Sequence, residues 1–187
     1  MKKDREELRA QLLILRCQTG DENAFSELFR AFSGRTHRYL RGLLGTEAAD
    51  DVQQDVWMTV YRTLATLHNP GGFRTWLYRI TRHRAIDRLR REQQTAERFE
   101  VLSDDDLAGT PDSPASEPEL GKAEIEAALD GLTPAHREVL LLKYWEEMSY
   151  AEIALVAGCS IGTVRSRVHH AKQSIKTILE EKPTQAQ

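Results

Sequence analysis

A stretch in the middle of the chain with almost no core-forming residues constrains what the chain can fold into. The segment "SDDDLAGTPDSPASEPELG", residues 103–121, consists mainly of acidic residues, Pro, Gly and Ser, and only Leu107 and Leu120 are strongly apolar. Such a composition cannot bury enough apolar surface to offset the entropy that ordering costs. We therefore predict a flexible acidic linker over residues 96–122, which separates two independently folded parts.

Both parts have the periodicity of helices, and neither shows the alternation that is typical of β-strands. In the first part, apolar residues recur at helical spacing over residues 23–45, 46–67 and 73–94. In the second part they do so over residues 122–132, 133–145, 149–158 and 160–181. The sequence therefore predicts an all-α fold of two small helical bundles, in residues 1–95 and 123–180, and a tail over residues 181–187.

Side chains that cap helices mark several of the predicted helix starts. Thr46, Thr133, Ser149 and Ser160 each precede a helical stretch and can accept a hydrogen bond from a backbone amide of the first turn. Gly158 lies where a tight turn between two helices needs a left-handed residue. These residues predict a short helix followed closely by a longer one near the end of the chain.

Charge is segregated along the chain, although the net charge is only −3. Residues 74–91 contain seven arginines and one acid, Asp87, whereas residues 97–119 contain eight acids and one base, Arg98. A basic segment followed by an acidic one is typical of a nucleic-acid-binding surface with a competitor nearby.

Several function classes are excluded by what the sequence lacks. No apolar run approaches the ~18 residues of a membrane span, and the start "MKKDREELRA" has no apolar core of a secretory signal. We therefore expect a cytoplasmic protein without membrane insertion. Cys17 and Cys159 are far apart and outside any Cys/His cluster, so we expect no metal and no cofactor. No nucleophile accompanies the carboxylates, which argues against an enzyme.

The segment 160–181 has one apolar side and one polar side. On a helical wheel the residues within about 60° of Val164 are apolar, namely Ile161, Val168, Ala171, Ile175 and Ile178. The opposite side is small and polar, and no carboxylate occurs from residue 153 to residue 179. A solvated surface helix would usually carry Glu among its Arg. With the short helix before it, this segment indicates a helix-turn-helix whose second helix enters the major groove.

Two parts of the sequence resemble regions of one known family. The segment "LTPAHREVLLLKYWEEMSYAEIALVAGCSIGTVRSRVHHAKQSIK" resembles region 4 of the extracytoplasmic-function (ECF) sigma factors, a group of the sigma-70 class. The segment "AADDVQQDVWMTVYRTL", followed by "FRTWLYRITRHRAIDRLRR", resembles their region 2. The resemblance covers roughly residues 20–92 and 124–178. Region 4 alone is weakly specific, because response-regulator output domains share its last helix, but region 2 in the right order makes the match strong.

The resemblance implies a promoter-recognition subunit of RNA polymerase. The first bundle would bind the clamp helices of the β′ subunit and the −10 promoter element. The second would bind the β flap and the −35 element, and an anti-sigma factor would be a further partner. A flexible linker of this length spans up to ~80 Å, more than the ~34 Å of one duplex turn, so it could bridge two promoter elements.

The family's core-binding stretch falls on residues 51–55. The segment 46–67 keeps an apolar stripe of Val52, Val56, Val60 and Leu64 on one side. Four residues share one helical face opposite this stripe and are expected to contact core polymerase: Asp51, Gln54, Asp55 and Met58. Asp50 and Asp51 also suit a helix N-terminus, where the helix dipole favours negative charge.

The loop of residues 67–72 and the basic face of the helix after it are the expected −10 surface. The candidate residues are His68, Asn69, Arg74, Arg79, Arg82, Arg84 and Arg88. Trp57 and Trp76 fall at positions that the family buries, so we expect core packing rather than base stacking from them. His83 replaces a frequent family Asn, which leaves the role of this position open.

The last helix supplies the expected −35 surface. The candidate residues are Thr163, Arg165, Ser166, Arg167, His169, His170 and Lys172, with Thr163 and Lys172 on phosphates. Many family members have Arg in place of His170, and a neutral imidazole makes a weaker phosphate contact.

Two other classes of protein fit part of the sequence. A transcription factor that is not a sigma subunit would combine the helix-turn-helix with a helical sensor domain and would bind promoter duplex without polymerase. An anti-sigma factor or adaptor would lack the basic helix of residues 73–94 or would carry a zinc-type His/Cys pattern.

Overall fold

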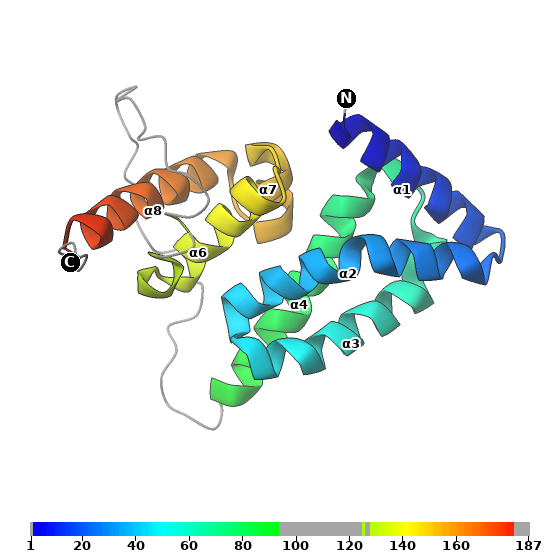
Figure 1. The fold of residues 1–187 in the computed structure, drawn as a ribbon, viewed down its shortest axis with the longest axis horizontal. Helices are drawn as coiled ribbons and strands as arrows, with labels where there is room; N and C mark the ends of the chain where they lie inside the picture. The colour runs from blue at the N-terminus through cyan, green and yellow to red at the C-terminus, as the bar shows by residue number, and fades with distance from the viewer. Residues whose placement is uncertain (1, 94–124, 126–127, 182–187) are drawn as a thin grey trace, which may run out of the picture. The chain divides into compact units, whose positions relative to one another are not determined.

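The computed structural model describes residues 2–93, 125 and 128–181 (Figure 1). The chain divides into two compact units, Met1–Glu97 and Arg98–Gln187. The whole predicted linker over residues 96–122 and the tail beyond residue 181 lie outside the described residues. Every described element is helical, which confirms the all-α prediction. None of the described helices is long and apolar enough to cross a membrane.

The described part of the first unit, residues 2–93, contains four α-helices and two short 3₁₀ turns. They are α1 (Lys2–Gln18), α2 (Glu22–Leu44), α3 (Thr46–Thr63), η1 (Leu64–Thr66), η2 (Pro70–Gly72) and α4 (Phe73–Gln93). The helices α2, α3 and α4 pack against one another, and α1 packs on α2 and on the two 3₁₀ turns. The core includes the stripe that periodicity predicted, formed by Val52, Val56 and Val60 on α3 and by Leu64 at the start of η1.

The helix α1 was not predicted from the sequence. Its inner face buries Ala10, Leu13 and Ile14 in the core, and these residues have the i, i+3, i+4 spacing that would have indicated a helix. Its outer face exposes Leu8 and Leu12 to solvent. These apolar outer residues obscure the amphipathic pattern of the segment.

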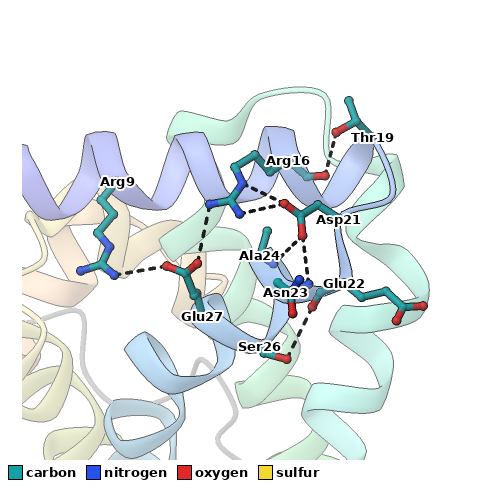
Figure 2. Close-up of polar contacts among 9 residues, drawn as sticks. All are labelled: Arg9, Arg16, Thr19, Asp21, Glu22, Asn23, Ala24, Ser26 and Glu27. Atoms are coloured by element: carbon teal, nitrogen blue, oxygen red, sulfur yellow. Dashed lines mark hydrogen bonds and ion pairs between the residues drawn. The ribbon is translucent and has the colours of Figure 1, made fainter.

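The corner between α1 and α2 is fixed by the side chain of Asp21 (Figure 2). One carboxylate oxygen of Asp21 accepts hydrogen bonds from the backbone amides of Asn23 (3.0 Å) and Ala24 (3.1 Å), as an N-cap does. The other oxygen accepts two from the Arg16 guanidinium, at 3.0 and 2.8 Å. The hydrogen bond from Arg16 is the main reason why the pKa of Asp21 is lowered below its ordinary value, and the Ala24 amide adds to it.

Asp21→Asn is expected to lower the melting temperature of the first unit at neutral pH, because Asn still caps α2 but loses the ion pair with Arg16. Since the pKa of Asp21 is lowered in the folded state, its stabilisation is complete above the unfolded pKa of ~3.9. It is lost as the pH falls through the lower folded pKa. The measurement is thermal denaturation of both proteins between pH 7 and pH 3. A difference in melting temperature that did not shrink toward acid pH would contradict the assignment.

The second unit is built around a long C-terminal helix. Its described elements are η3 (Leu129–Gly131), α6 (Pro134–Leu140), η4 (Leu141–Trp145), α7 (Tyr150–Ala157) and α8 (Ile161–Glu181). Both α6 and α7 pack on α8. The predicted helix over residues 133–145 continues from α6 into the π-helical turn η4. Of the predicted helix over residues 122–132, the structure describes Ile125 and residues 128–132, which include the 3₁₀ turn η3.

The predicted caps are confirmed in the second unit but not in the first. The hydroxyls of Thr133, Ser149 and Ser160 each accept a hydrogen bond from the backbone amide three residues on. Gly158 has φ = 69°, which is the left-handed turn that was expected. Thr46 is instead the first residue of α3, and the cap position is occupied by the preceding glycine, which offers no side chain.

Candidate polymerase and nucleic-acid interfaces

The four residues predicted to contact core polymerase lie together on the exposed side of α3. Asp51, Gln54 and Asp55 are exposed, and Met58 is 52% exposed. Their face is opposite the buried Val stripe, as the helical spacing predicted. The structure thus offers one continuous surface with two carboxylates, an amide and a thioether to a partner.

An apolar extension of this surface was missed in the sequence. Tyr61 lies one turn beyond Met58 on α3 and is 61% exposed. Its ring packs edge-on against Phe25 of α2, with centroids 5.0 Å apart, and exposed Phe29 packs in the same way on Trp57. Large apolar side chains that stay exposed next to polar ones are typical of a protein interface. The spacing of Tyr61, three residues after Met58, would have placed it on this face.

The arginines of α4 do not form a single face. Taking Leu77 as the centre of the buried side, Arg84 and Arg88 lie within about 20° of it, whereas Arg79 and Arg82 lie about 140–160° away. Arg84 donates a hydrogen bond to the Thr59 hydroxyl on α3 at 2.9 Å.

Arg88 also reaches α3. A guanidinium nitrogen of Arg88 lies 3.8 Å from a carboxylate oxygen of Asp51, so a predicted DNA residue contacts a predicted polymerase residue. Arg74, at the start of α4, is half-buried. Exposed Arg79 and half-buried Arg82 lie on the side of α4 opposite Leu77, here called its open side, apart from the arginines that contact α3.

The loop before α4 presents a small polar tip. His68 and Asn69 are both exposed. The side-chain oxygen of Asn69 accepts a hydrogen bond from the Gly71 amide at 3.0 Å and so caps η2. This bond fixes the orientation of the Asn69 side chain. His68 is the exposed residue immediately before this capped turn.

Both tryptophans of the first unit contribute to its core, as expected. Trp57 is buried among core residues, and Trp76 is half-buried and packs against the same cluster. His83, in contrast, projects from α4 and lies 3.0 Å from the Asp87 carboxylate one turn on.

The helix α8 has the buried and polar sides that its sequence predicts, with one exception. Val164, Val168, Ala171 and Ile175 are fully buried. Ile161, which the helical wheel placed in the same stripe, is 48% exposed. It is the first residue of the helix, where too little of the second unit packs around it to cover the side chain.

The predicted −35 residues of the first turns are accessible. Arg165 is exposed, and the other four have partly exposed side chains: Ser166, Arg167, His169 and His170. Thr163 is half-buried, and its hydroxyl lies 2.9 Å from that of Ser160. A face with donors and without described carboxylates suits the phosphates and base edges of a DNA groove.

Several of these side chains are oriented by neighbours. Arg167 donates to the Cys159 sulfur at 3.9 Å, and the His169 ring nitrogen lies 2.9 Å from the Gln173 amide nitrogen. The His170 ring stacks near that of His136 on α6, with centroids 6.4 Å apart. The contribution of His136 was not predicted, because its proximity depends on how α6 packs against α8.

Lys172 does not lie where the sequence analysis placed it. Only 7% of the residue is exposed, and its ammonium group lies 5.9 Å from the centre of the Tyr144 ring. The predicted phosphate contact of Lys172 is therefore wrong for this conformation. At about 80° from Val164 on the helical wheel, Lys172 lies at the edge of the packed stripe, and its long stem lets the amine fold into the unit.

Whether the described residues could form a metal site beside these surfaces depends on how their His, Cys, Asp and Glu side chains are grouped. Among the described residues, no group of three or more His, Cys, Asp or Glu side chains could hold a metal ion. Both cysteines are free thiols, and burial raises the pKa of the Cys17 thiol above its ordinary value. A raised pKa keeps the thiol protonated and unreactive.

Comparisons with known proteins agree with the division into two units. Residues 28–95 match the family model of Sigma-70 region 2, and residues 122–175 match that of Sigma-70, region 4. The chain is 35% identical to the ECF RNA polymerase sigma factor SigE of Mycolicibacterium smegmatis over 86% of this chain and 65% of that protein. It is 33% identical to the RNA polymerase sigma-H factor of Pseudomonas aeruginosa over 91% of this chain and 93% of that protein.

Solved structures show the same fold. CnrH, in a complex with the cytosolic domain of CnrY, matches with a TM-score of 0.66 at 23% identity and covers 93% of this chain and 99% of its own. The sigma factor RpoE of Bartonella quintana, in a complex with the anti-sigma factor NepR, matches with a TM-score of 0.64 at 23% identity, over 84% and 98% of the two chains. The match to region 2 decides against the alternatives of a non-sigma transcription factor and an adaptor. The chain belongs to the ECF sigma factors of the sigma-70 family, which are not enzymes but bind RNA polymerase and recognise promoters to initiate transcription.

Proposed function

We propose that the first unit binds the clamp helices of the polymerase β′ subunit through the exposed face of α3. The observation that supports this most directly is that Asp51, Gln54, Asp55 and Met58 all project from one side of a helix whose other side is fully packed. The acids would attract a basic partner helix, and exposed Tyr61 would add apolar contact area at the end of the same face.

We propose that the loop tip and the open side of α4 contact the −10 element. His68 and Asn69 would contact an unstacked base, and Arg79 and Arg82 would line the path of the displaced strand. Arg74 belongs to the same surface. Arg84 and Arg88 are held toward α3. They would therefore contribute a long-range positive potential to DNA binding rather than direct contacts.

For the second unit we propose binding to the β flap and to the −35 element. Arg165, Ser166 and Arg167 lie in the first turns of α8, the part of a recognition helix that reaches base edges in a helix-turn-helix. His169, His170 and Thr163 would add contacts to the same groove or its phosphates. Lys172 is left out of this surface because it is buried.

We also propose an anti-sigma factor as a partner and the cytoplasm as the place of action. Support for the partner comes from the neighbouring structures, in which CnrH is bound to CnrY and RpoE is bound to the anti-sigma factor NepR. The location is supported by the proposed partners, because the protein must reach core polymerase and promoter DNA to bind them.

Co-purification with core RNA polymerase, followed by run-off transcription on genomic promoters, tests the proposal. We expect a stable holoenzyme that starts transcription at a defined set of promoters, while the free protein binds the same DNA poorly. Tight promoter binding without polymerase, together with no effect on core transcription, would refute the proposal.

A further inference from the structure

The N-terminal helix holds the loop that leads to α4. The side-chain amide nitrogen of Gln18, at the end of α1, donates hydrogen bonds to the backbone carbonyls of Leu64 at 3.2 Å and Leu67 at 2.8 Å. These carbonyls lie 46 and 49 residues further along the chain. A single half-buried amide thus connects the end of the first helix to both ends of the turn that follows α3.

The other contacts of the loop leave a small tip between two fixed ends. At the first end, the Leu67 amide donates to the Leu64 carbonyl at 3.1 Å, and Leu64 is buried in the core. At the second end, Asn69 caps η2 and the buried Phe73 starts α4. His68 lies between these ends, so its position depends on where the Leu67 carbonyl is held.

A second residue of α1 approaches the same loop. A Cβ atom placed on Gly71 would lie 3.5 Å from the side-chain nitrogen of Gln11. Gln11 and Gln18 are seven residues apart, which puts them on the same side of the helix. The inner side of α1 therefore carries two amides against the loop as well as the apolar residues that anchor the helix.

We propose that Gln18 is a positioning residue for −10 recognition. By holding the Leu64 and Leu67 carbonyls it would keep His68 and Asn69 in the geometry that receives an unstacked base, so that binding does not have to order the loop. Fixing a recognition element before binding raises affinity because less ordering entropy is lost on binding. A fixed tip also cannot rearrange to accommodate an altered base, which raises selectivity. The inference rests on the proposed function of the loop, and it adds a contribution from a helix outside the −10 surface itself.

Three substitutions separate the hydrogen bonds from the shape of the side chain. Gln18→Met keeps the length without a donor, and Gln18→Glu keeps the shape but places a carboxylate against two carbonyls. Gln18→Lys restores a donor of sufficient reach. Thr19→Val serves as the matched control, since the Thr19 hydroxyl donates only to the Arg16 carbonyl of its own helix end.

The readout is discrimination between a promoter and the same promoter with an altered −10 element, measured as holoenzyme affinity and as run-off transcription. We expect Gln18→Met and Gln18→Glu to lower this ratio about tenfold, as the loss of two part-buried hydrogen bonds allows. Gln18→Lys should recover most of it, and Thr19→Val should match the wild type. Affinity for core polymerase and discrimination at the −35 element should not change.

His68→Ala, measured beside these variants, distinguishes failure of the proposed loop function from failure of the proposed role of Gln18. If His68→Ala lowers −10 discrimination and Gln18→Met does not, the loop has its proposed function and the role of Gln18 is refuted. Gln18→Met could instead reduce transcription uniformly on all promoters, or Gln18→Lys and Gln18→Met could have equal effects. Either result would mean that Gln18 only supports the fold and would also refute its positioning role. If His68→Ala leaves discrimination intact, the proposed function of the loop fails and the inference fails with it.

Discussion

A variant carrying both Gln54→Ala and Asp55→Lys is expected to lose co-purification with core RNA polymerase. Both side chains are exposed at the centre of the α3 face. A partner that contacts them would therefore lose the hydrogen bonds of the Gln54 amide and would face a positive charge in place of the Asp55 carboxylate. Losing one partner of a buried charged contact costs ~2–5 kcal/mol, which corresponds to a weakening of roughly 30-fold to several thousandfold. Competition with the wild-type protein for a limiting amount of core polymerase measures the loss.

The same variant must keep its fold for this result to count. Substitutions at exposed positions of this kind usually change the free energy of unfolding by less than ~0.5 kcal/mol. The thermal denaturation curve should therefore be nearly unchanged. Glu7→Lys, a charge reversal at an exposed position of α1, controls for the change in net charge and should co-purify normally. A loss of several kcal/mol in stability would mark Gln54 and Asp55 as residues of the fold and would contradict the interface.

Arg165→Ala is expected to relax the sequence preference at one position of the −35 element. Arg165 is the exposed arginine of the first turns of α8, and the loss of one bidentate contact to a base costs ~1–3 kcal/mol of discrimination. Binding of holoenzyme to promoters in which each −35 base pair is varied in turn measures the effect. A uniform weakening on every sequence would instead make Arg165 a phosphate contact.

Lys172→Met is the companion to this experiment. It keeps the apolar stem and removes the charge, and a phosphate contact would lower the slope of log affinity against log salt by about one. Because Lys172 is buried, we expect no change in the salt slope. A reduced slope would mean that Lys172 leaves its buried position when DNA binds.

Helices with one apolar stripe could be predicted from the sequence almost completely. The stripe of Val52, Val56 and Val60 on α3 gave both the helix and its exposed opposite face, because burial on one side fixes the exposure of the other. The caps at Ser149 and Ser160 were equally predictable, since their hydrogen bonds are local. Thr46 failed as a cap because the preceding glycine took that position.

Features that depend on contacts between helices could not be predicted in the same way. The sequence gives α4 a row of arginines, but only the packing of α4 on α3 brings Arg84 to Thr59 and Arg88 to Asp51. Lys172 shows the same limit, because a long side chain at the edge of a stripe follows the space that Tyr144 leaves for its amine. The bonds of Gln18 join positions more than 40 residues apart, and no local pattern indicates them.

The two units have separate cores, and this has a thermodynamic consequence. The core around Leu28, Val56 and Leu77 shares no described residue with the core around Leu140, Ala171 and Ile175. A single melting temperature therefore does not describe this chain, since all-or-none unfolding holds for one cooperative core at a time. A ligand present at a hundred times its Kd stabilises the unit that it binds by ~2.7 kcal/mol. We expect the transition of the other unit not to move. Calorimetry with short −35 duplexes, at concentrations high enough to offset the weak DNA binding of the free protein, would thus test which transition belongs to the second unit.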